Sequence, residues 1–161
     1  MKRSVVMLAL GVVLGGCAES ATEPGVELQV IEETDFAASL GIDLSAMTRL
    51  ESGVYVQDLV VGTGPVAIFG TTVSFNLTGW LSDGTQWTRA TENLELGLTP
   101  TIAGIEDAVF LMPQGGVRLA VIPPGRAYGS LPRLDASGNV VVPAGSILVF
   151  EIELVSVVEG E

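Results

Sequence analysis

One short helical pattern stands among segments that otherwise have strand patterns, and this imbalance limits the folds that the chain can adopt. Four apolar residues of the segment TIAGIEDAVFLM recur at helical spacing: Ile102, Ile105, Val109 and Met112. Glu106 and Asp107 fall on the opposite side of such a helix, which makes it amphipathic. The pattern therefore predicts a single short helix over residues 101–112, with one face packed against other elements.

Strand patterns occupy most of the remaining chain after residue 53. VYVQDLVV is a strand candidate that ends at the turn cluster GTGP. TTVSFNLTGWL alternates apolar and polar residues, and the turn SDG leads into a returning strand that begins with TQW. VRLAVI has the pattern of a central strand that two prolines end, because proline cannot donate to a strand ladder.

The last strand pattern, LVFEIELVSV, has one apolar and one charged face. Glu151 and Glu153 alternate there with apolar residues, as in a strand with one solvated face. We interpret these two acids as surface residues rather than as a catalytic or metal-binding pair. The order of all these segments predicts an α+β fold, in which a curved antiparallel sheet half-wraps around one short helix. Residues 53–161 suit one domain.

The first 16 residues have the three regions of an export signal. They combine a charged start, an apolar stretch and small residues just before Cys17. The apolar stretch is shorter than the about 20 residues that span a bilayer, which favours a removed signal peptide. LGGC resembles the bacterial lipobox, in which the cysteine becomes lipid-modified and begins the mature protein. We therefore expect lipidation at Cys17; the alternative is a stray thiol in an ordinary cleavage region.

Lipidation would hold the protein in the cell envelope through a lipid anchor. Several acyl chains on one cysteine supply the multiple signals that stable membrane attachment requires. Ala18 stands where an inner-membrane retention signal would often be acidic, so the periplasmic face of the outer membrane is the expected location. Cys17 is the only cysteine, so its lipidation would leave no thiol for a disulfide, a metal site or a nucleophile.

Residues 17–52 are expected to join the anchor to the domain. AESATEPG resembles a solvated tether. The remainder carries apolar residues that suggest docking on the domain: Phe36, Leu40, Ile42, Leu44 and Met47. A partner-binding arm is the alternative for this second part.

Charge and composition exclude several kinds of function. After removal of residues 1–16 the chain has five arginines, no lysine and 19 acidic residues, a formal charge of −14. Such a surface repels phosphate backbones, so we expect no nucleic-acid partner. Without lysine there is no Schiff-base chemistry, and without histidine the usual general base and metal ligand are absent. We expect no metal, no cofactor and no conventional proton-transfer catalysis.

The ordered set of motifs from about Gly53 to Val157 resembles the FKBP-type peptidyl-prolyl cis/trans isomerases. Four segments carry the resemblance: SGVYVQDLVVGTG, VSFNLTGWLSDGTQW, LGLTPTIAGIEDAVFLMPQGGVRLAVIPPGRAYGS and VPAGSILVFEIELVSV. The resemblance implies an apolar pocket that binds proline-containing protein segments, and a macrolide as a further possible ligand. It also implies that Tyr128, in the motif AYG, donates its hydroxyl to a substrate carbonyl at the pocket rim.

The remaining pocket positions follow from the same resemblance. Trp87, Phe150 and Val142 stand at wall positions, and Ile102 stands where a backbone N–H meets a substrate carbonyl. The other substrate-binding positions are Leu77, Thr88, Thr101 and Ile105. Three of these depart from the family pattern: Leu77 replaces a pocket tyrosine, Ile105 replaces the floor tryptophan, and Thr88 replaces an acidic residue beside the wall aromatic.

Isomerisation of an X-Pro bond suits a chain that lacks the usual catalytic side chains. Rotation is opposed by a barrier of about 18–20 kcal/mol and breaks no bond, so neither nucleophile nor base is needed. We therefore expect a membrane-tethered isomerase that assists the folding of exported proteins. Two alternatives stay open: a chaperone-like binding module of the same fold with weak or no activity, and a structural envelope lipoprotein whose pocket is filled core.

Overall fold

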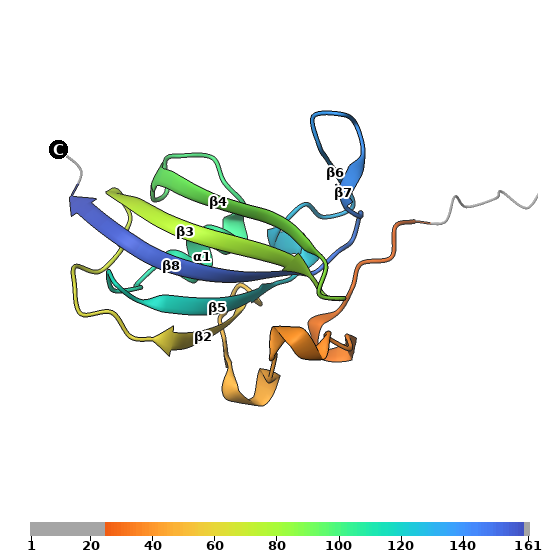
Figure 1. Cartoon of the computed structure of the whole chain (residues 1–161), viewed down its shortest axis with the longest axis horizontal. Helices are drawn as coiled ribbons and strands as arrows, with labels where there is room; N and C mark the ends of the chain where they lie inside the picture. The colour runs from red at the N-terminus through yellow and green to blue at the C-terminus, as the bar shows by residue number, and fades with distance from the viewer. Residues whose placement is uncertain (1–24, 160–161) are drawn as a thin grey trace, which may run out of the picture.

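A six-stranded antiparallel sheet curves around helix α1 (Ala103–Val109) in the computed structural model, which describes residues 25–159 (Figure 1). The strand order is β1-β2-β5-β8-β3-β4. Its members are β1 (Thr48–Arg49), β2 (Tyr55–Val60), β3 (Thr71–Leu81), β4 (Gln86–Glu95), β5 (Val117–Ile122) and β8 (Leu148–Glu159). A separate hairpin pairs β6 (Arg133–Leu134) with β7 (Val140–Val142). Short 3-10 turns lie at Ile31–Glu33, Ala38–Leu40, Leu44–Ala46 and Pro124–Arg126. The predicted α+β class is confirmed.

The helix is shorter than the sequence pattern predicts. It begins at Ala103 rather than at residue 101, because Ile102 is still extended, with ψ of 121°. It ends at Val109, since Phe110 leaves the helical region and Leu111 adopts a positive φ of 59°. Met112 nevertheless donates its N–H to the Val109 carbonyl at 3.0 Å, so the chain turns tightly and keeps Met112 buried.

The main core lies between α1 and the concave face of the sheet. The predicted alternation holds in β3, where Phe75 and its neighbours at spacing two point inward, and in β8, where Glu151 and Glu153 are exposed. Complete burial of one large apolar side chain stabilises the folded state by about 1.5–3 kcal/mol. The inward residues of the two strands are Val73, Phe75, Leu77, Leu148, Phe150, Ile152 and Leu154.

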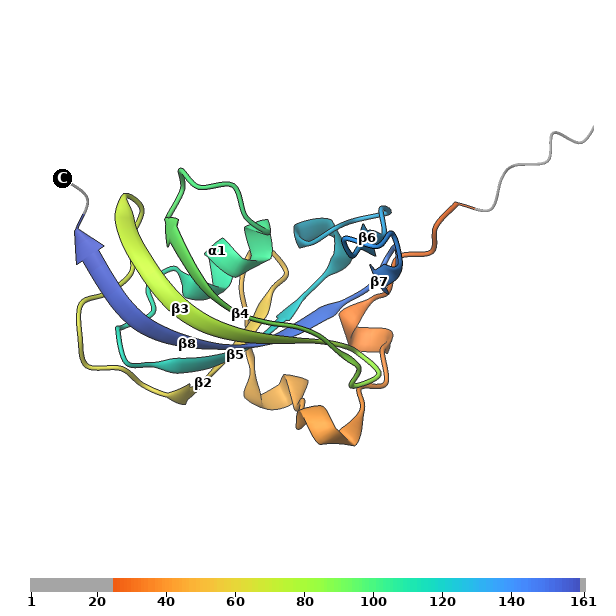
Figure 2. The same cartoon turned by 45° about the horizontal axis from the view of Figure 1, so that its top comes forward.

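The opposite face of the sheet is covered at one end by the segment that precedes it. Figures 1 and 2 show residues 31–47 on the side of the sheet away from α1. Ile31 and Met47 are buried there against Tyr55 and Val149. Four further residues of this segment pack against the same cluster: Phe36, Leu40, Ile42 and Leu44. The boundary at residue 53 therefore divides two parts that are in contact, and it stays a prediction.

The β6–β7 hairpin had no counterpart in the sequence prediction. Its strands have only two or three residues, and most of them are exposed, so no apolar alternation marks them. The turn is organised by Asp135, whose carboxylate accepts hydrogen bonds from the backbone of Ser137 and from both the backbone and the side chain of Asn139. The hairpin projects beyond the end of the sheet on the side of α1 (Figure 1).

The predicted signal peptide (residues 1–16), Cys17 and residues 18–24 lie outside the described residues. Within residues 25–159 no helix is both long and apolar enough to cross a membrane.

Helix α1 packs tightly against β5 at Gly104, and this contact generates a stability prediction. A Cβ on Gly104 would overlap Cγ2 of Ile122, which is fully buried and cannot move aside. Gly104→Ala is expected to destabilise the protein by about 1–3 kcal/mol in urea denaturation, although the same change in an exposed helix stabilises. Gly125→Ala is the control, because a Cβ there meets no atom within 4 Å. A Gly104→Ala protein as stable as the parent would contradict this packing.

Candidate functional site

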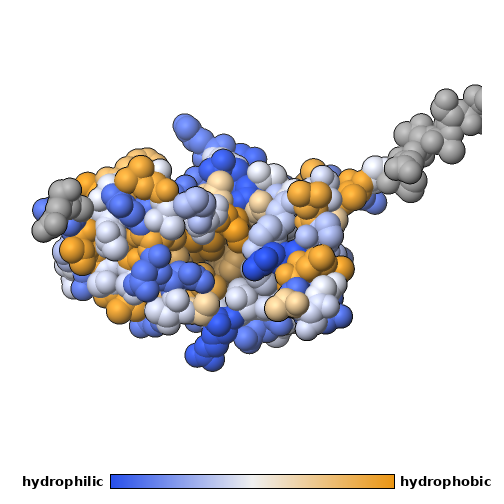
Figure 3. Space-filling model, turned by 90° about the horizontal axis from the view of Figure 1, so that it is seen from above, coloured by the Kyte–Doolittle hydropathy of each residue, from blue (hydrophilic) through white to orange (hydrophobic). Residues whose placement is uncertain are grey.

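A cavity of about 520 Å³ opens on the side of the sheet that carries α1. It is bounded by α1, by the inner faces of β3, β4 and β8, and by the chain that follows β5. Figure 3 shows this face, where apolar surface runs into a hollow near the middle of the molecule. The lining residues are Phe75, Leu77, Trp87, Thr88, Glu92, Pro100, Thr101, Ile102, Ile105, Ala127, Tyr128, Arg133 and Phe150.

Three aromatic side chains form one wall of this cavity. The ring centroids of Trp87 and Phe150 are 5.7 Å apart with an interplanar angle of 73°, and those of Trp87 and Tyr128 are 6.1 Å apart at 76°. Both pairs are edge-to-face, the arrangement that the ring quadrupoles favour. Trp87 therefore lies between the other two rings, and these three predicted side chains converge.

A bulge in the β3–β4 pairing brings Trp87 into the wall. Gly79 pairs with Thr88 and Trp80 pairs with Gln86, so Trp87 is the extra residue between them. Bulges of this kind turn a side chain away from the direction that strict alternation would give it. The cavity side of β3 also needs a glycine here, because a Cβ on Gly79 would lie 2.6 Å from Cε1 of Phe150.

Tyr128 lies on the irregular chain that follows β5. Pro123 and Pro124 end the strand and begin the turn Pro124–Arg126, which delivers Tyr128 half-buried to the cavity. Burial raises the pKa of the Tyr128 hydroxyl above its ordinary value of 10, while the nearby positive charge of Arg133 acts in the opposite direction. The hydroxyl is therefore a neutral hydrogen-bond donor at physiological pH.

The floor of the cavity is apolar and leaves it open. Phe75 is fully buried, Leu77 is 8% exposed and Ile105 is 2% exposed, and all three line the cavity. Ile105, which stands at the predicted floor position, forms a boundary of the space and does not fill it. Thr88 lies on the same inner side of β4, beside Trp87, and contributes a neutral hydroxyl.

The rim next to α1 is formed by the residues that lead into the helix. Thr101 is exposed and Ile102 is partly buried, and both line the cavity. The carbonyl of Ile102 accepts the N–H of Ile105 at 2.8 Å. The N–H of Ile102 donates to no acceptor within residues 25–159, so it is free to meet a ligand carbonyl.

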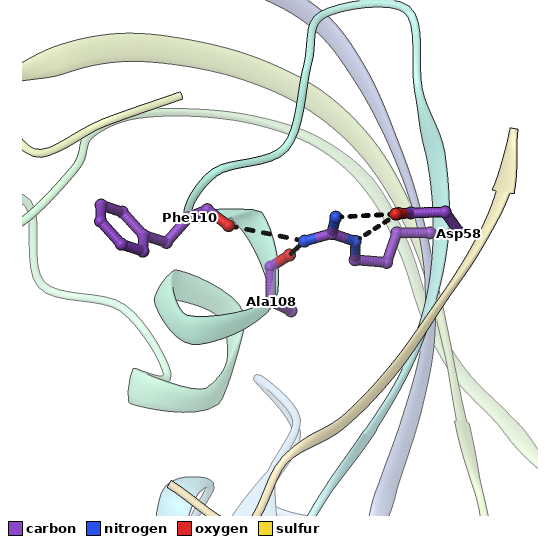
Figure 4. Close-up of polar contacts among 4 residues, drawn as sticks. Asp58, Ala108 and Phe110 are labelled. Atoms are coloured by element: carbon purple, nitrogen blue, oxygen red, sulfur yellow. Dashed lines mark hydrogen bonds and ion pairs between the residues drawn. The ribbon is translucent and has the colours of Figure 1, made fainter. Parts of the chain in front are cut away.

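A buried arginine fixes the far end of the helix that carries this floor. Arg118 of β5 donates Nη1 to the carbonyls of Ala108, at 2.8 Å, and Phe110, at 3.5 Å (Figure 4). Its Nε and Nη2 donate to both carboxylate oxygens of Asp58 on β2, at 2.6 and 3.2 Å. The guanidinium therefore joins the C-terminus of α1 to two strands, and satisfies carbonyls that the helix leaves free.

One predicted wall position lies outside the cavity lining. Val142 is not among the lining residues. It is 1% exposed, belongs to β7 and packs in the main core cluster that also contains Phe150.

Two charged residues of the lining were missed by sequence reasoning. Glu92 reaches the cavity because it pairs with the inward-facing Phe75 across β3 and β4. That register depends on the bulge at Trp87, which no local pattern reveals. Arg133 reaches it from the β6–β7 hairpin, which was not predicted. The other missed lining residues are Phe75, Pro100 and Ala127.

Among residues 25–159 no three Cys, Asp or Glu side chains cluster closely enough to hold a metal ion. What the geometry does supply is a space with an aromatic wall and an apolar floor, the neutral hydroxyls of Thr88, Thr101 and Tyr128, and a backbone N–H at its rim. Such a space can exclude water from a bound group and hold two carbonyls.

Comparisons with known proteins agree with this geometry. The sequence profile of the family described as FKBP-type peptidyl-prolyl cis-trans isomerase matches residues 65–155. An FK506-binding protein of Neisseria meningitidis is 31% identical over 112 residues, which cover 66% of this chain and 98% of that protein.

Solved structures also resemble this chain in fold. A peptidyl-prolyl cis-trans isomerase from Pseudomonas syringae has a TM-score of 0.63 and 28% identity, over 76% of this chain and 87% of that one. FkpA from Escherichia coli has a TM-score of 0.61 and 26% identity over 72% of this chain; the match spans 53% of FkpA, about half its length. Because the profile covers more than half of its residues, the chain belongs to the FKBP-type peptidyl-prolyl cis-trans isomerase family.

Proposed function

We propose that this isomerase is tethered to the outer membrane by a lipid on Cys17 and acts on exported polypeptides on the periplasmic side. The observation that carries the proposal for the site is the open cavity between Trp87, Tyr128 and Phe150, whose rings meet edge to face. The space is large enough for a prolyl ring and its neighbours.

The cavity accelerates rotation because it stabilises the twisted amide relative to the planar amide. The planar X-Pro amide is the more polar state, so a water-poor wall of Trp87, Phe150 and Ile105 destabilises it relative to the twisted state. Tyr128 donates its hydroxyl to one substrate carbonyl, and the Ile102 N–H donates to another. These two donors hold the twisted geometry without any proton transfer.

The two charged lining residues give this site its own polar side. The family's acidic position is taken by Thr88, and Glu92 and Arg133 supply the charges at the cavity instead. We expect these charges to meet substrate residues that flank the proline, and so to select among substrate sequences.

The tether proposal rests on the sequence before residue 25. A signal-like segment is followed by a lipobox-like LGGC that contains Cys17. A lipid on Cys17 would keep the catalytic domain attached to the membrane.

A second candidate is a binding module that holds proline-containing segments with little acceleration. Thr88 is the observation that favours it, because a neutral hydroxyl polarises the cavity less than a carboxylate does. A structural lipoprotein with a filled core is disfavoured by the open cavity of about 520 Å³. A macrolide is proposed as a competing ligand, since the Neisseria relative is named an FK506-binding protein.

Removing the Tyr128 hydroxyl tests the isomerase site. Tyr128→Phe is expected to lower kcat/KM in a protease-coupled prolyl peptide assay by about three- to tenfold, the value of one hydrogen bond. Phe150→Ala is expected to lower it further, because it opens the wall to water. Tyr55→Phe is the matched control, since the Tyr55 hydroxyl bonds to Glu32 on the other face of the sheet. A parent protein without rate enhancement at any concentration would reject catalysis.

The pH dependence of the reaction follows from the titrating groups. No histidine is present, and the pKa of the Tyr128 hydroxyl is raised above 10 by burial, so the donor stays protonated until alkaline pH. We expect kcat/KM to be constant between about pH 6 and 9, and to fall only above about pH 10 as Tyr128 ionises. A sigmoidal step near neutral pH would show that another group takes part.

Lipidation is tested by the fate of Cys17. The mature protein is expected in the outer-membrane fraction with the mass of an acylated N-terminus, whereas Cys17→Ser should lack the lipid mass and leave that fraction. Mass spectrometry and membrane fractionation measure the two properties. An unmodified thiol at Cys17, or a parent protein found wholly in the soluble periplasm, would overturn the anchor.

A further inference from the structure

Residues 26–31, the N-terminal brace, bond to the loop that precedes β8. Gln29 makes three hydrogen bonds, two with this loop and one with the turn between β3 and β4. Its N–H donates to the Gly145 carbonyl at 2.9 Å, its Oε1 accepts the N–H of Ile147 at 2.7 Å, and its Nε2 donates to Oγ of Ser82 at 3.4 Å. Figure 2 shows this part of the chain passing beside the end of the molecule that carries β7.

Gly145 also bonds to the residue that follows Tyr128, and so links the brace to the tyrosine of the site. While its carbonyl accepts from the brace, its N–H donates to the carbonyl of Gly129 at 2.8 Å. Gly129 directly follows Tyr128, and the N–H of Gly129 donates to the Pro124 carbonyl at 2.8 Å. A continuous path of backbone hydrogen bonds therefore runs from Gln29 through Gly145 to the turn that carries Tyr128.

The contact between the brace and Gly145 is close enough to require a glycine. Gly145 is buried and has a positive φ of 76°, and a Cβ there would overlap the carbonyl oxygen of Glu27. Any other residue would be strained in this backbone conformation and would push the brace away.

The loop that carries Tyr128 depends on such contacts because no strand pairing holds it. Residues 123–132 lie between β5 and β6, outside both sheets. On the side of α1 the loop is held by Arg126, whose guanidinium donates to both carboxylate oxygens of Asp107 at 2.9 and 2.8 Å. On the other side it is held by Gly145, and hence by the brace.

We propose that Gln29 is a positioning residue. Its side chain, bonded to Ile147 and Ser82, keeps its backbone N–H on the carbonyl of Gly145. Through Gly145 it sets the place of the Tyr128 hydroxyl relative to Trp87 and the bound proline. The N-terminal brace then helps to position a catalytic residue of the site. This inference rests on the role of Tyr128 in the proposed function. It predicts that loss of the Gln29 side-chain bonds to Ile147 and Ser82, which loosens the brace from Gly145, acts on catalysis only by way of Tyr128.

A double-mutant cycle in the full chain tests this route. Gln29→Ala is expected to lower kcat/KM about fivefold in the parent and by less than about 1.5-fold in the Tyr128→Phe background, because the hydroxyl that it positions is already absent. The loss should lie mainly in kcat. Gln29→Glu keeps the acceptor for Ile147 and should recover most of the activity.

Tyr55→Phe is the control for loosening of the same segment. It removes the hydrogen bond between Tyr55 and Glu32 without touching Gly145, and is expected to leave kcat/KM unchanged. The emission of Trp87, read in a Trp80→Phe background, should shift with Gln29→Ala and Gly145→Ala but not with Tyr55→Phe.

Three outcomes would overturn the proposal: equal fold losses from Gln29→Ala in both backgrounds, no loss in the parent, or the same loss from Tyr55→Phe. A parent protein with no activity would reject the proposed function itself, whereas an active parent with additive losses would reject only the positioning role.

Discussion

The packing of α1 against β5 determines where a cavity can form in this protein. Gly104 lets the helix approach Ile122 without a side chain between them, and Arg118 holds its C-terminus by two carbonyls. Because the helix occupies the core beside β5, the inner faces of β3, β4 and β8 are left partly uncovered next to it. That uncovered surface, closed by Trp87, Phe150 and the Tyr128 loop, is the site.

The sequence predicted the parts of this arrangement that depend on local periodicity. Alternation in β3 and β8 placed Phe75 and Phe150 inward, and the resemblance to the family placed Trp87 and Tyr128 at one pocket. What was missed depends on contacts between distant segments. Val142 was assigned to the wall, yet it is buried in the main core and does not line the cavity. Arg133 enters from a hairpin too short for a pattern.

The chemistry of the site follows from what the chain lacks. With no histidine, and with its one lysine in the predicted signal peptide, it has no ordinary base or amine nucleophile. An X-Pro rotation needs neither, since dry surroundings and two fixed donors suffice. Because so few groups act on the substrate, the position of the Tyr128 hydroxyl is important. We propose that the contacts of Gln29 with Gly145 affect function by setting that position. By this proposal the N-terminal brace, which follows the proposed anchor, contributes to catalysis.

The central claim is that a prolyl ring enters the cavity against Trp87, and the indole N–H of that residue reports it directly. Nε1 of Trp87 is buried and has no hydrogen-bond partner among residues 25–159, and Trp80 supplies the only other indole signal. In an NMR titration, a proline-containing peptide should shift the Trp87 indole resonance, and the same peptide with alanine for proline should not. Equal shifts with both peptides, or a Trp87 signal that does not move, would contradict the account.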